Sequence, residues 1–305
     1  MLPFLARRLL FAIITLFVVS LIVFAMARIA GDPRTMMLGD FTTTQQFERV
    51  GERLGLDKPY YVQYWIFLKG MVRGDFGTST ATTKEVTGLI LQRLGATFQL
   101  AGVAFLFAII VGVPLGVLSA VKRGSIFDQL GKFLAFIGQS APSFWIGIML
   151  IFFFSVRLGW VPPSGRGEWN SIFLPAISLG WFFMAANMRL VRSSMLDVLD
   201  SEYIKLAKAK GVGRRAVIWK HALRNAVIPP LTFAGVSLGG LVTGSISTEL
   251  VFAWPGLGLL AINSTLQSDY TVLQAVVIVF TLLYLAAAFL VDVLYAFADP
   301  RIRYA

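Results

Sequence analysis

Six long segments without a charged residue constrain this chain more than any other feature of its sequence. A hydrocarbon core of roughly 30 Å is crossed by about 20 helical residues. Because that core holds no water to satisfy backbone amides, apolar runs of this length must be helical. We therefore predict an all-α membrane protein with about six transmembrane helices. The runs are Leu9–Ala27, Leu94–Val121, Phe133–Val156, Ser171–Met188, Ala226–Thr248 and Tyr270–Val291.

The composition supports a chain that resides in a bilayer. Apolar residues make up 57% of the chain and charged residues only 14%, whereas soluble domains are about a quarter charged. A membrane β-barrel is excluded because barrel strands alternate apolar and polar residues over about ten positions, and these runs do not. The absence of cysteine rules out disulfides, thiol catalysis and cysteine-ligated metal sites.

The distribution of Lys and Arg predicts that both termini lie in the cytoplasm, because short cytoplasmic loops are enriched in these residues. In this orientation the short outer loops hold only Arg157 and Arg166. The inner side then holds Arg7, Arg8, Lys122, Arg123, Lys132, Arg189, Arg192, Lys205, Lys208, Lys210, Arg214, Arg215, Lys220, Arg224, Arg301 and Arg303. Topology therefore explains the net charge of +11, and we expect no binding of nucleic acid.

We predict a single transmembrane domain over residues 1–305, with two sizeable segments outside the spans. The outer one, at about 31–93, contains turn signals and two short amphipathic stretches, Gln45–Leu54 and Tyr60–Val72. The inner one, at about 189–226, is strongly basic. Together they predict soluble segments on opposite sides of the membrane.

The inner segment predicts two surface helices separated by a glycine turn. Leu199–Lys210 is amphipathic, Gly211 and Gly213 interrupt it, and Ala216–Leu223 resumes a helical pattern. Its basic amphipathic character is typical of a helix held on anionic lipid headgroups. It is equally typical of a docking element whose apolar side enters a groove on a cytoplasmic partner. The residues alone leave both interpretations open.

These residues resemble the inner-membrane permeases of ATP-binding-cassette (ABC) importers, in particular the dipeptide, oligopeptide and nickel transport group. The stretches Glu202–Gly211 and His221–Pro229 are similar to the signature loop of that group. In the family this loop forms the coupling helix, which enters a cleft of the ATPase subunit. The resemblance thus assigns ATPase coupling to Glu202, Tyr203, Leu206, Ala207, Ala209, Gly211, His221, Arg224 and Pro229.

Further matches to the family occur in order along the chain. They are Arg7–Leu10, Gly31–Pro33, Leu54–Pro59, Gly74–Ser79, Trp254–Gly258, Asp292–Tyr295 and Asp299–Arg303. The resemblance implies the type I permease fold and a multi-pass location in the bacterial inner membrane. It also implies a heterodimer with a second permease, two ATPase subunits inside and a solute-binding protein outside. Transport would follow alternating access driven by ATP closing the two ATPases together.

The energy source is expected to lie outside this chain. The sequence contains no Gly-x-x-x-x-Gly-Lys-Ser/Thr phosphate loop, so ATP and Mg²⁺ would be bound by partner subunits. A proton-coupled carrier normally has ionisable residues within its spans, and the six runs have none, with Glu249 and Asp292 at helix ends. We expect no catalytic site, no cofactor and no metal site in this chain. His221 is its only histidine, which rules out a site made of several histidines.

Small residues in the fifth run predict close helix packing. Gly235 with Gly239, and Gly240 with Gly244, have the small-xxx-small spacing that lets helices approach, as do Gly112 and Gly116 in the second run. Packing is favoured over substrate contact, and the fifth span is a hypothesis for the interface between the two permeases.

Pro142 predicts a kink in the third span, because proline removes a helical hydrogen bond. Its polar neighbours Gln139 and Ser140 are candidates for lining the transport path, with packing as the other interpretation. Pro175 predicts an interruption near one end of the fourth span. Trp254 is interpreted as an aromatic anchor at the membrane interface, with a gate or a contact to the binding protein as the other interpretation.

The predicted function is a permease subunit that forms half of the translocation pathway for peptides or a similar small solute. The alternative is a membrane signalling or assembly protein that docks a cytoplasmic partner without transport. The solute itself is not encoded in any motif of this chain, and glutathione, opines, oligosaccharides and nickel complexes remain open beside peptides.

Overall fold

The computed structural model describes the whole chain except residues 1, 32–33, 35–47, 49–50, 52–55 and 299–305. The predicted helix Gln45–Leu54 lies almost entirely outside the described residues, as do the motif residues Asp32, Pro33 and Asp299–Arg303. The described chain divides into two compact units. Unit 1 combines residues 1–97 with 255–305, and unit 2 comprises residues 98–254.

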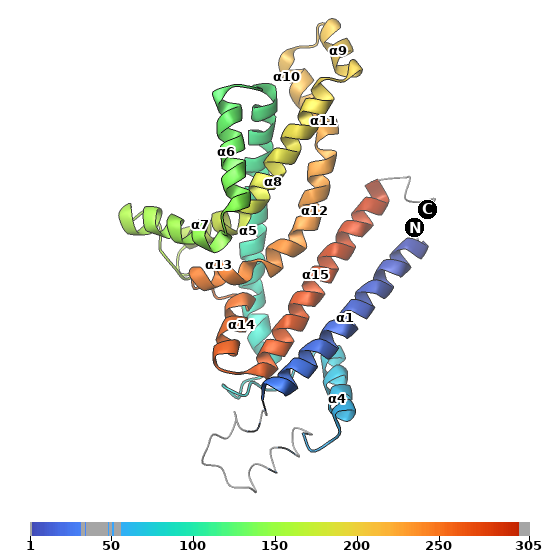
Figure 1. The fold of residues 1–305 in the computed structure, drawn as a ribbon, viewed down its shortest axis with the longest axis vertical. Coiled ribbons are helices and arrows are strands. Elements are labelled where there is room, and N and C mark those ends of the chain that lie inside the picture. Colours follow the sequence, from blue (N-terminus) through green and yellow to red (C-terminus); the bar gives the residue numbers. More distant parts are fainter. Residues whose placement is uncertain (1, 32–33, 35–47, 49–50, 52–55, 299–305) are drawn as a thin grey trace. The chain divides into compact units, whose positions relative to one another are not determined.

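Unit 1 is built on two long helices from opposite ends of the chain. Helices α1 (Leu2–Ala30) and α15 (Tyr270–Ala298) lie side by side (Figure 1). Near one end of the pair, the Arg8 guanidinium contacts the Asp292 carboxylate at 3.2 Å. Helix α14 (Leu257–Leu266) packs on α15, and α4 (Tyr60–Arg73) packs on α1. These contacts bring the two ends of the sequence into one bundle.

One carboxylate organises the loop that precedes α5 (Val86–Val121). Asp269, 2% exposed, lies just before α15 and accepts a 2.5 Å hydrogen bond from the Ser79 hydroxyl. It also accepts hydrogen bonds from the Thr80 hydroxyl and from the backbone N–H groups of Thr80 and Val272. Residues 77–84, which belong to the predicted outer loop and are named here the outer strap for that reason, are thereby held against the start of α15.

Unit 2 is arranged around α8 (Phe173–Leu199), which contacts α6 (Ile126–Ser140), α7 (Ser143–Leu150), α12 (Ile228–Thr243) and α13 (Ser245–Val251). The figure shows this central position within the unit (Figure 1). The α7 helix continues into a π-helical segment, Ile151–Arg157.

Glycines allow α5 to approach α8 closely. A Cβ atom on Gly112 would lie 2.8 Å from the Met184 carbonyl oxygen, and one on Gly116 would lie 2.7 Å from the Met188 carbonyl oxygen. Backbone atoms cannot move aside as flexible side chains can, so larger residues are excluded at both positions. The close packing predicted from the spacing of Gly112 and Gly116 is confirmed.

A buried carboxylate joins α5, α6 and α8 at one end of unit 2. Asp128 is 0% exposed and receives two hydrogen bonds from Arg192, from Nε at 2.7 Å and from Nη2 at 3.1 Å. The Ser119 hydroxyl and the Gly124 N–H also donate to it, and the Lys132 ammonium lies 3.0 Å away. Lys132 and Arg192 lie outside the uncharged runs of the sequence, but both belong to helices that continue beyond those runs.

The predicted spans require three corrections. The third run is broken rather than kinked, because α6 and the α7 segment are bent by 113° at Ala141 and Pro142. The fifth run is divided into α12 and α13 at Gly244, and a further bend of 51° separates α12 from the residues before it. Pro175 does not interrupt the fourth span, because it occupies the first turn of α8, where its missing N–H has no helical partner to lose.

The count of spans depends on how the bent pairs are treated. Among the described residues, four helices are long and apolar enough to cross a membrane, and up to six spans result if each bent pair is one span. The α5 helix begins at Val86 and α8 ends at Leu199, so both extend beyond the predicted runs. The first charged residue indicates where the hydrocarbon core ends. The helix can continue past that point, because charged residues are compatible with a helical backbone.

We expect Asp128→Ala to destabilise unit 2 by about 3–5 kcal/mol, because it leaves Arg192 and Lys132 without their shared carboxylate. Thermal unfolding of the purified chain in detergent measures this loss. Asp197→Asn is the matched control, since Asp197 is an exposed acid on α8. Equal unfolding temperatures for the Asp128→Ala variant and the unaltered chain would contradict the assignment.

We also expect Asp269→Ala to release the outer strap, because Ser79, Thr80 and Ala81 of the strap would lose the acceptor of their hydrogen bonds. Trypsin cleavage after Lys84, which is exposed, is expected to accelerate about tenfold as local opening becomes easier. The control variant Asp57→Asn removes the same charge from an exposed position of unit 1. If both variants are cleaved at the same rate, Asp269 does not hold the strap.

Candidate functional site

The predicted coupling loop forms a compact helical projection after α8. Helix α9 (Glu202–Ala209) is followed by α10 (Arg214–Ala216), a π-helical segment (Val217–Ala222) and α11 (Leu223–Ala226). The chain turns after α9 at Gly211, whose φ of +78° lies in the left-handed region that favours glycine. Residues 202–226 are named here the coupling segment.

Ile204 anchors α9 to the body of unit 2. Its side chain is 0% exposed and belongs to a buried apolar cluster with Met195 of α8 and with Val217, Ala222 and Ala226 of the coupling segment. Full burial of an isoleucine side chain contributes about 1.5–3 kcal/mol. The helix is therefore docked through one face, and sequence analysis did not single out this residue.

The opposite face of α9 is open. Glu202, Leu206 and Ala209 are spaced by four and three residues, so they share one side of the helix, and all three are exposed. The Leu206 side chain is 56% exposed. In the π-helical segment that follows, the Trp219 side chain is 50% exposed. Exposed apolar side chains on a basic segment are typical of a site that contacts a protein partner.

A polar contact joins α9 to α11. The Asn225 side-chain amide donates a 2.7 Å hydrogen bond to the Tyr203 hydroxyl oxygen, and that hydroxyl donates a longer one, 3.4 Å, to the His221 carbonyl. Asn225 lies two residues before Val227, where the chain bends into α12. Sequence reasoning missed Asn225 because its partner is 22 residues away and no periodicity links them.

The remaining predicted coupling residues occupy different environments. Ala207 and His221 are half-buried, whereas Arg224 is exposed on α11. Pro229 lies in the first turn of α12, where proline is well tolerated. Glu202 pairs with Lys205 at 2.7 Å, but both side chains are largely in solvent and such a pair adds little stability. The coupling roles of these residues remain predictions.

The predicted pore residues are distributed over two places in unit 2. At the end of α6, Gln139 accepts a hydrogen bond from Arg189 of α8, while Ser140 and Pro142 are exposed. On α12, Gly239 is buried. A Cβ atom on Gly240 would lie 3.4 Å from the Phe183 ring. Gly235 is half-buried and Gly244 is exposed at the end of the helix. Their role in packing across a dimer or in the transport path stays a prediction.

Trp254 is not an exposed interfacial anchor. Its side chain is 1% exposed, and the Arg166 guanidinium lies over its ring at 5.8 Å from the centroid. Glu249, predicted to lie at a helix end, is 0% exposed in the last turn of α13 and accepts a 3.0 Å hydrogen bond from the Ser245 hydroxyl. The sequence indicates that both residues lie near the end of a span. It does not indicate which side of the chain packs against other helices at that point.

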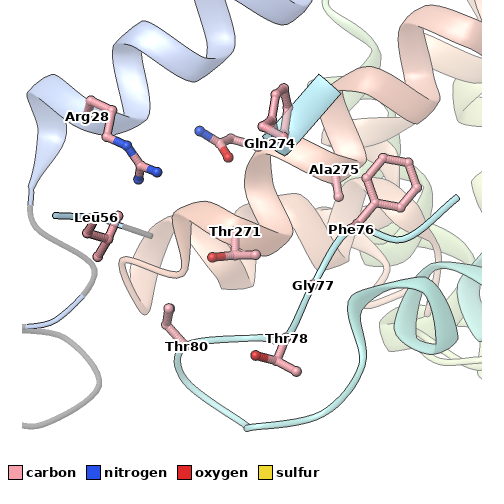
Figure 2. Close-up of a pocket in the computed structure, with 10 residues that line it drawn as sticks. Arg28, Leu56, Phe76, Gly77, Thr78, Thr80, Thr271, Gln274 and Ala275 are labelled. Carbon is pink, nitrogen blue, oxygen red and sulfur yellow. The ribbon is translucent and has the colours of Figure 1, made fainter. Parts of the chain in front are cut away.

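Unit 1 contains a small pocket of about 150 Å³ with a lining of mixed polarity. Arg28 of α1 and Gln274 of α15 line it together with threonines of the outer strap (Figure 2). The Arg28 guanidinium also donates to the Gln63 side chain at 2.9 Å. Ligand pockets usually measure about 300–1,000 Å³, so this cavity suits part of a solute or a protein side chain rather than a whole peptide. Within the described residues, no group of three metal-ligating side chains occurs.

Comparison with known proteins assigns the chain to a family. Residues 112–304 match the model of the "binding-protein-dependent transport system inner membrane component", and residues 1–101 match the model of the N-terminal part of such membrane components. A dipeptide transport system permease of Alkalihalophilus pseudofirmus is 39% identical, and a glutathione transport system permease of Escherichia coli K12 is 41% identical. Both alignments cover 100% of each chain.

Solved structures show the same fold. An inward-facing methionine ABC transporter matches with a TM-score of 0.57 at 23% identity, covering 69% of this chain and 96% of that one. An amino acid ABC transporter matches with a TM-score of 0.55 at 13% identity, covering 68% and 93%. The fold predicted for the chain, an all-α permease of the type found in ABC importers, is confirmed. The chain belongs to the family of inner-membrane components of binding-protein-dependent ABC transport systems.

Proposed function

We propose that this permease forms half of the pathway through which an ABC importer takes up peptides or similar small solutes. The family establishes a transport component of the bacterial inner membrane, which disfavours the signalling or assembly alternative. The solute class is inferred from relatives that carry dipeptides or glutathione and align over their full length. These cargoes share a peptide-like backbone with free carboxylates.

The observation that carries the coupling role is the two-sided character of α9. One side is fixed to unit 2 through Ile204, and the other presents Leu206 and Ala209 to solvent. A helix that is packed on one side and exposed on the other can bind a partner through its exposed face and transmit the partner's movement to the rest of unit 2. We infer that this partner is a cytoplasmic ATPase subunit, which would bind ATP and Mg²⁺ and supply the work.

The inferred topology places both termini and the coupling segment in the cytoplasm. The seven basic residues of α9 to α11 are all exposed: Lys205, Lys208, Lys210, Arg214, Arg215, Lys220 and Arg224. A concentration of Lys and Arg on one side supports this orientation. The outer strap and the pocket beside Arg28 would then face the solute-binding protein.

The assembly we infer contains this permease as one domain, a second homologous permease, two ATPases and an external solute-binding protein. The glycines of α12 support the interface between the permeases, because Gly235 and Gly239 lie one turn apart and Gly235 is only half-buried within this chain. We infer no catalytic site here: the chemistry of ATP hydrolysis belongs to the partner subunits.

Uptake identifies the solute class. Proteoliposomes holding the complete complex are expected to accumulate labelled dipeptides or glutathione when ATP is enclosed on the ATPase side. An excess of unlabelled peptide should reduce this uptake, while an equal concentration of a sugar should not. Uptake that is blocked by the sugar and not by the peptide would contradict the proposed solute class.

We expect Leu206→Asp to uncouple the transporter, because it places a charge in the centre of the apolar docking face of α9. Peptide uptake should fall at least about tenfold, the effect of losing roughly 1.4 kcal/mol of binding energy, and ATPase subunits should no longer co-purify. Lys205→Gln, on the same helix, is the matched control and should leave both readouts unchanged. Normal uptake by Leu206→Asp would place the docking surface elsewhere.

The contact between Tyr203 and Asn225 is expected to position α9 relative to α12. Tyr203→Phe and Asn225→Leu should each reduce uptake while ATPase subunits still co-purify, because the docking face remains intact. The double variant should be no worse than either single one, since both remove the same hydrogen bond. Asn225→Asp cannot donate this hydrogen bond, but its carboxylate can accept one from the Tyr203 hydroxyl in the reverse direction and should restore uptake relative to Asn225→Leu. Additive losses would show that the two residues act separately.

A further inference from the structure

A second cavity lies beneath α9 in unit 2. It measures about 380 Å³ and lies among the ends of α5 and α8, helix α9 and the residues that follow it. Three of its lining residues are ionisable, Asp200, Lys208 and Arg214, and the other five are aliphatic. Such a lining suits a molecule that has both a charged part and an apolar part.

This cavity is separate from the proposed docking face. Lys208 follows Ile204 by four residues, so it lies on the side of α9 that faces the body of unit 2. Leu206 and Ala209 lie on the other side and do not line the cavity. A partner seated on the exposed face of α9 would therefore leave the cavity vacant for another ligand.

The charged groups of the cavity are open to solvent. Asp200, Lys208 and Arg214 are exposed, and none of them forms an ion pair in the part of the chain that the structure describes. Two positive charges and one negative charge give the lining a net charge of about +1 at neutral pH. A ligand with one negative charge would neutralise it.

The cavity lies at the ends of two helices that contain candidate membrane spans. Val121 is the last residue of α5 and Leu199 the last residue of α8, and both line the cavity. The uncharged part of α5 continues to Val121, which places this end close to the lipid headgroups. Basic pockets between transmembrane helices on the cytoplasmic side are typical binding sites for anionic lipid headgroups.

We propose that this cavity binds the headgroup of one anionic phospholipid, phosphatidylglycerol. The phosphate lies between Lys208 and Arg214, the glycerol hydroxyls donate hydrogen bonds to Asp200, and the first methylenes of the acyl chains cover the aliphatic lining. A soluble phosphate would leave that lining in water, and a zwitterionic lipid would leave one positive charge unmatched. The assignment rests on the membrane topology proposed above, but it is independent of the transported solute.

The experiment is native mass spectrometry of the full complex released from nanodiscs that contain phosphatidylglycerol and phosphatidylcholine in equal amounts. The unaltered complex is expected to retain phosphatidylglycerol preferentially. Lys208→Gln with Arg214→Gln should reduce this retention about tenfold or more, since each basic residue contributes about 1 kcal/mol near an anionic surface. Val212→Trp, which fills the cavity without a change of charge, should reduce it as well.

The matched control is Lys205→Gln with Arg215→Gln, which removes two exposed charges that do not line the cavity. An equal loss of lipid in this control would indicate diffuse attraction and overturn the proposal. Displacement of the lipid by an equal concentration of glycerol 3-phosphate would assign the site to a soluble anion. If the cavity variants keep the lipid but lose the ATPase subunits, the occupant is protein. Failure of peptide uptake with lipid retention intact would count against the proposed solute alone.

Discussion

The requirement that every backbone amide be satisfied without water determines the architecture of this permease. Each crossing segment must be a helix, and any break in a helix must occur where other groups satisfy the freed backbone. Both broken spans lie in unit 2, where α8 packs against the two helices on either side of the first break and against α12 and α13. The helices on both sides of the first break are thus held against α8.

Polar side chains join the helices where the apolar spans end. Asp128 connects three helices in unit 2, and Asp269 connects the outer strap to α15 in unit 1. Both carboxylates are almost fully buried, so their hydrogen bonds offset a desolvation cost that no exposed pair incurs. Such contacts fix the relative positions of segments that are far apart in sequence. In a bilayer, apolar helix surfaces do not do this by themselves, because lipid tails are as apolar as the side chains they contact.

The coupling segment combines a fixed side with an open side. Ile204 and the contact between Tyr203 and Asn225 attach α9 to the body of unit 2, and the attachment reaches the residues just before the bend into α12. The open side of α9 presents Leu206 and Ala209 on a segment rich in exposed basic residues. Movement of α9 by a partner would therefore be conveyed to α12 rather than absorbed in a flexible loop.

The sequence by itself determined the helical class, the approximate position of the apolar segments, the glycine turn at Gly211 and the family. These features depend on local composition and spacing, because hydrophobic length and backbone freedom act within one segment. Only the tertiary structure decided that the third run bends by 113°, that Trp254 and Glu249 are buried, and that Ile204 rather than Tyr203 faces the core. It also paired Asp128 with Arg192 and Tyr203 with Asn225. Each of these outcomes depends on which helices meet, and a contact between residues distant along the chain leaves no periodic signal in one sequence.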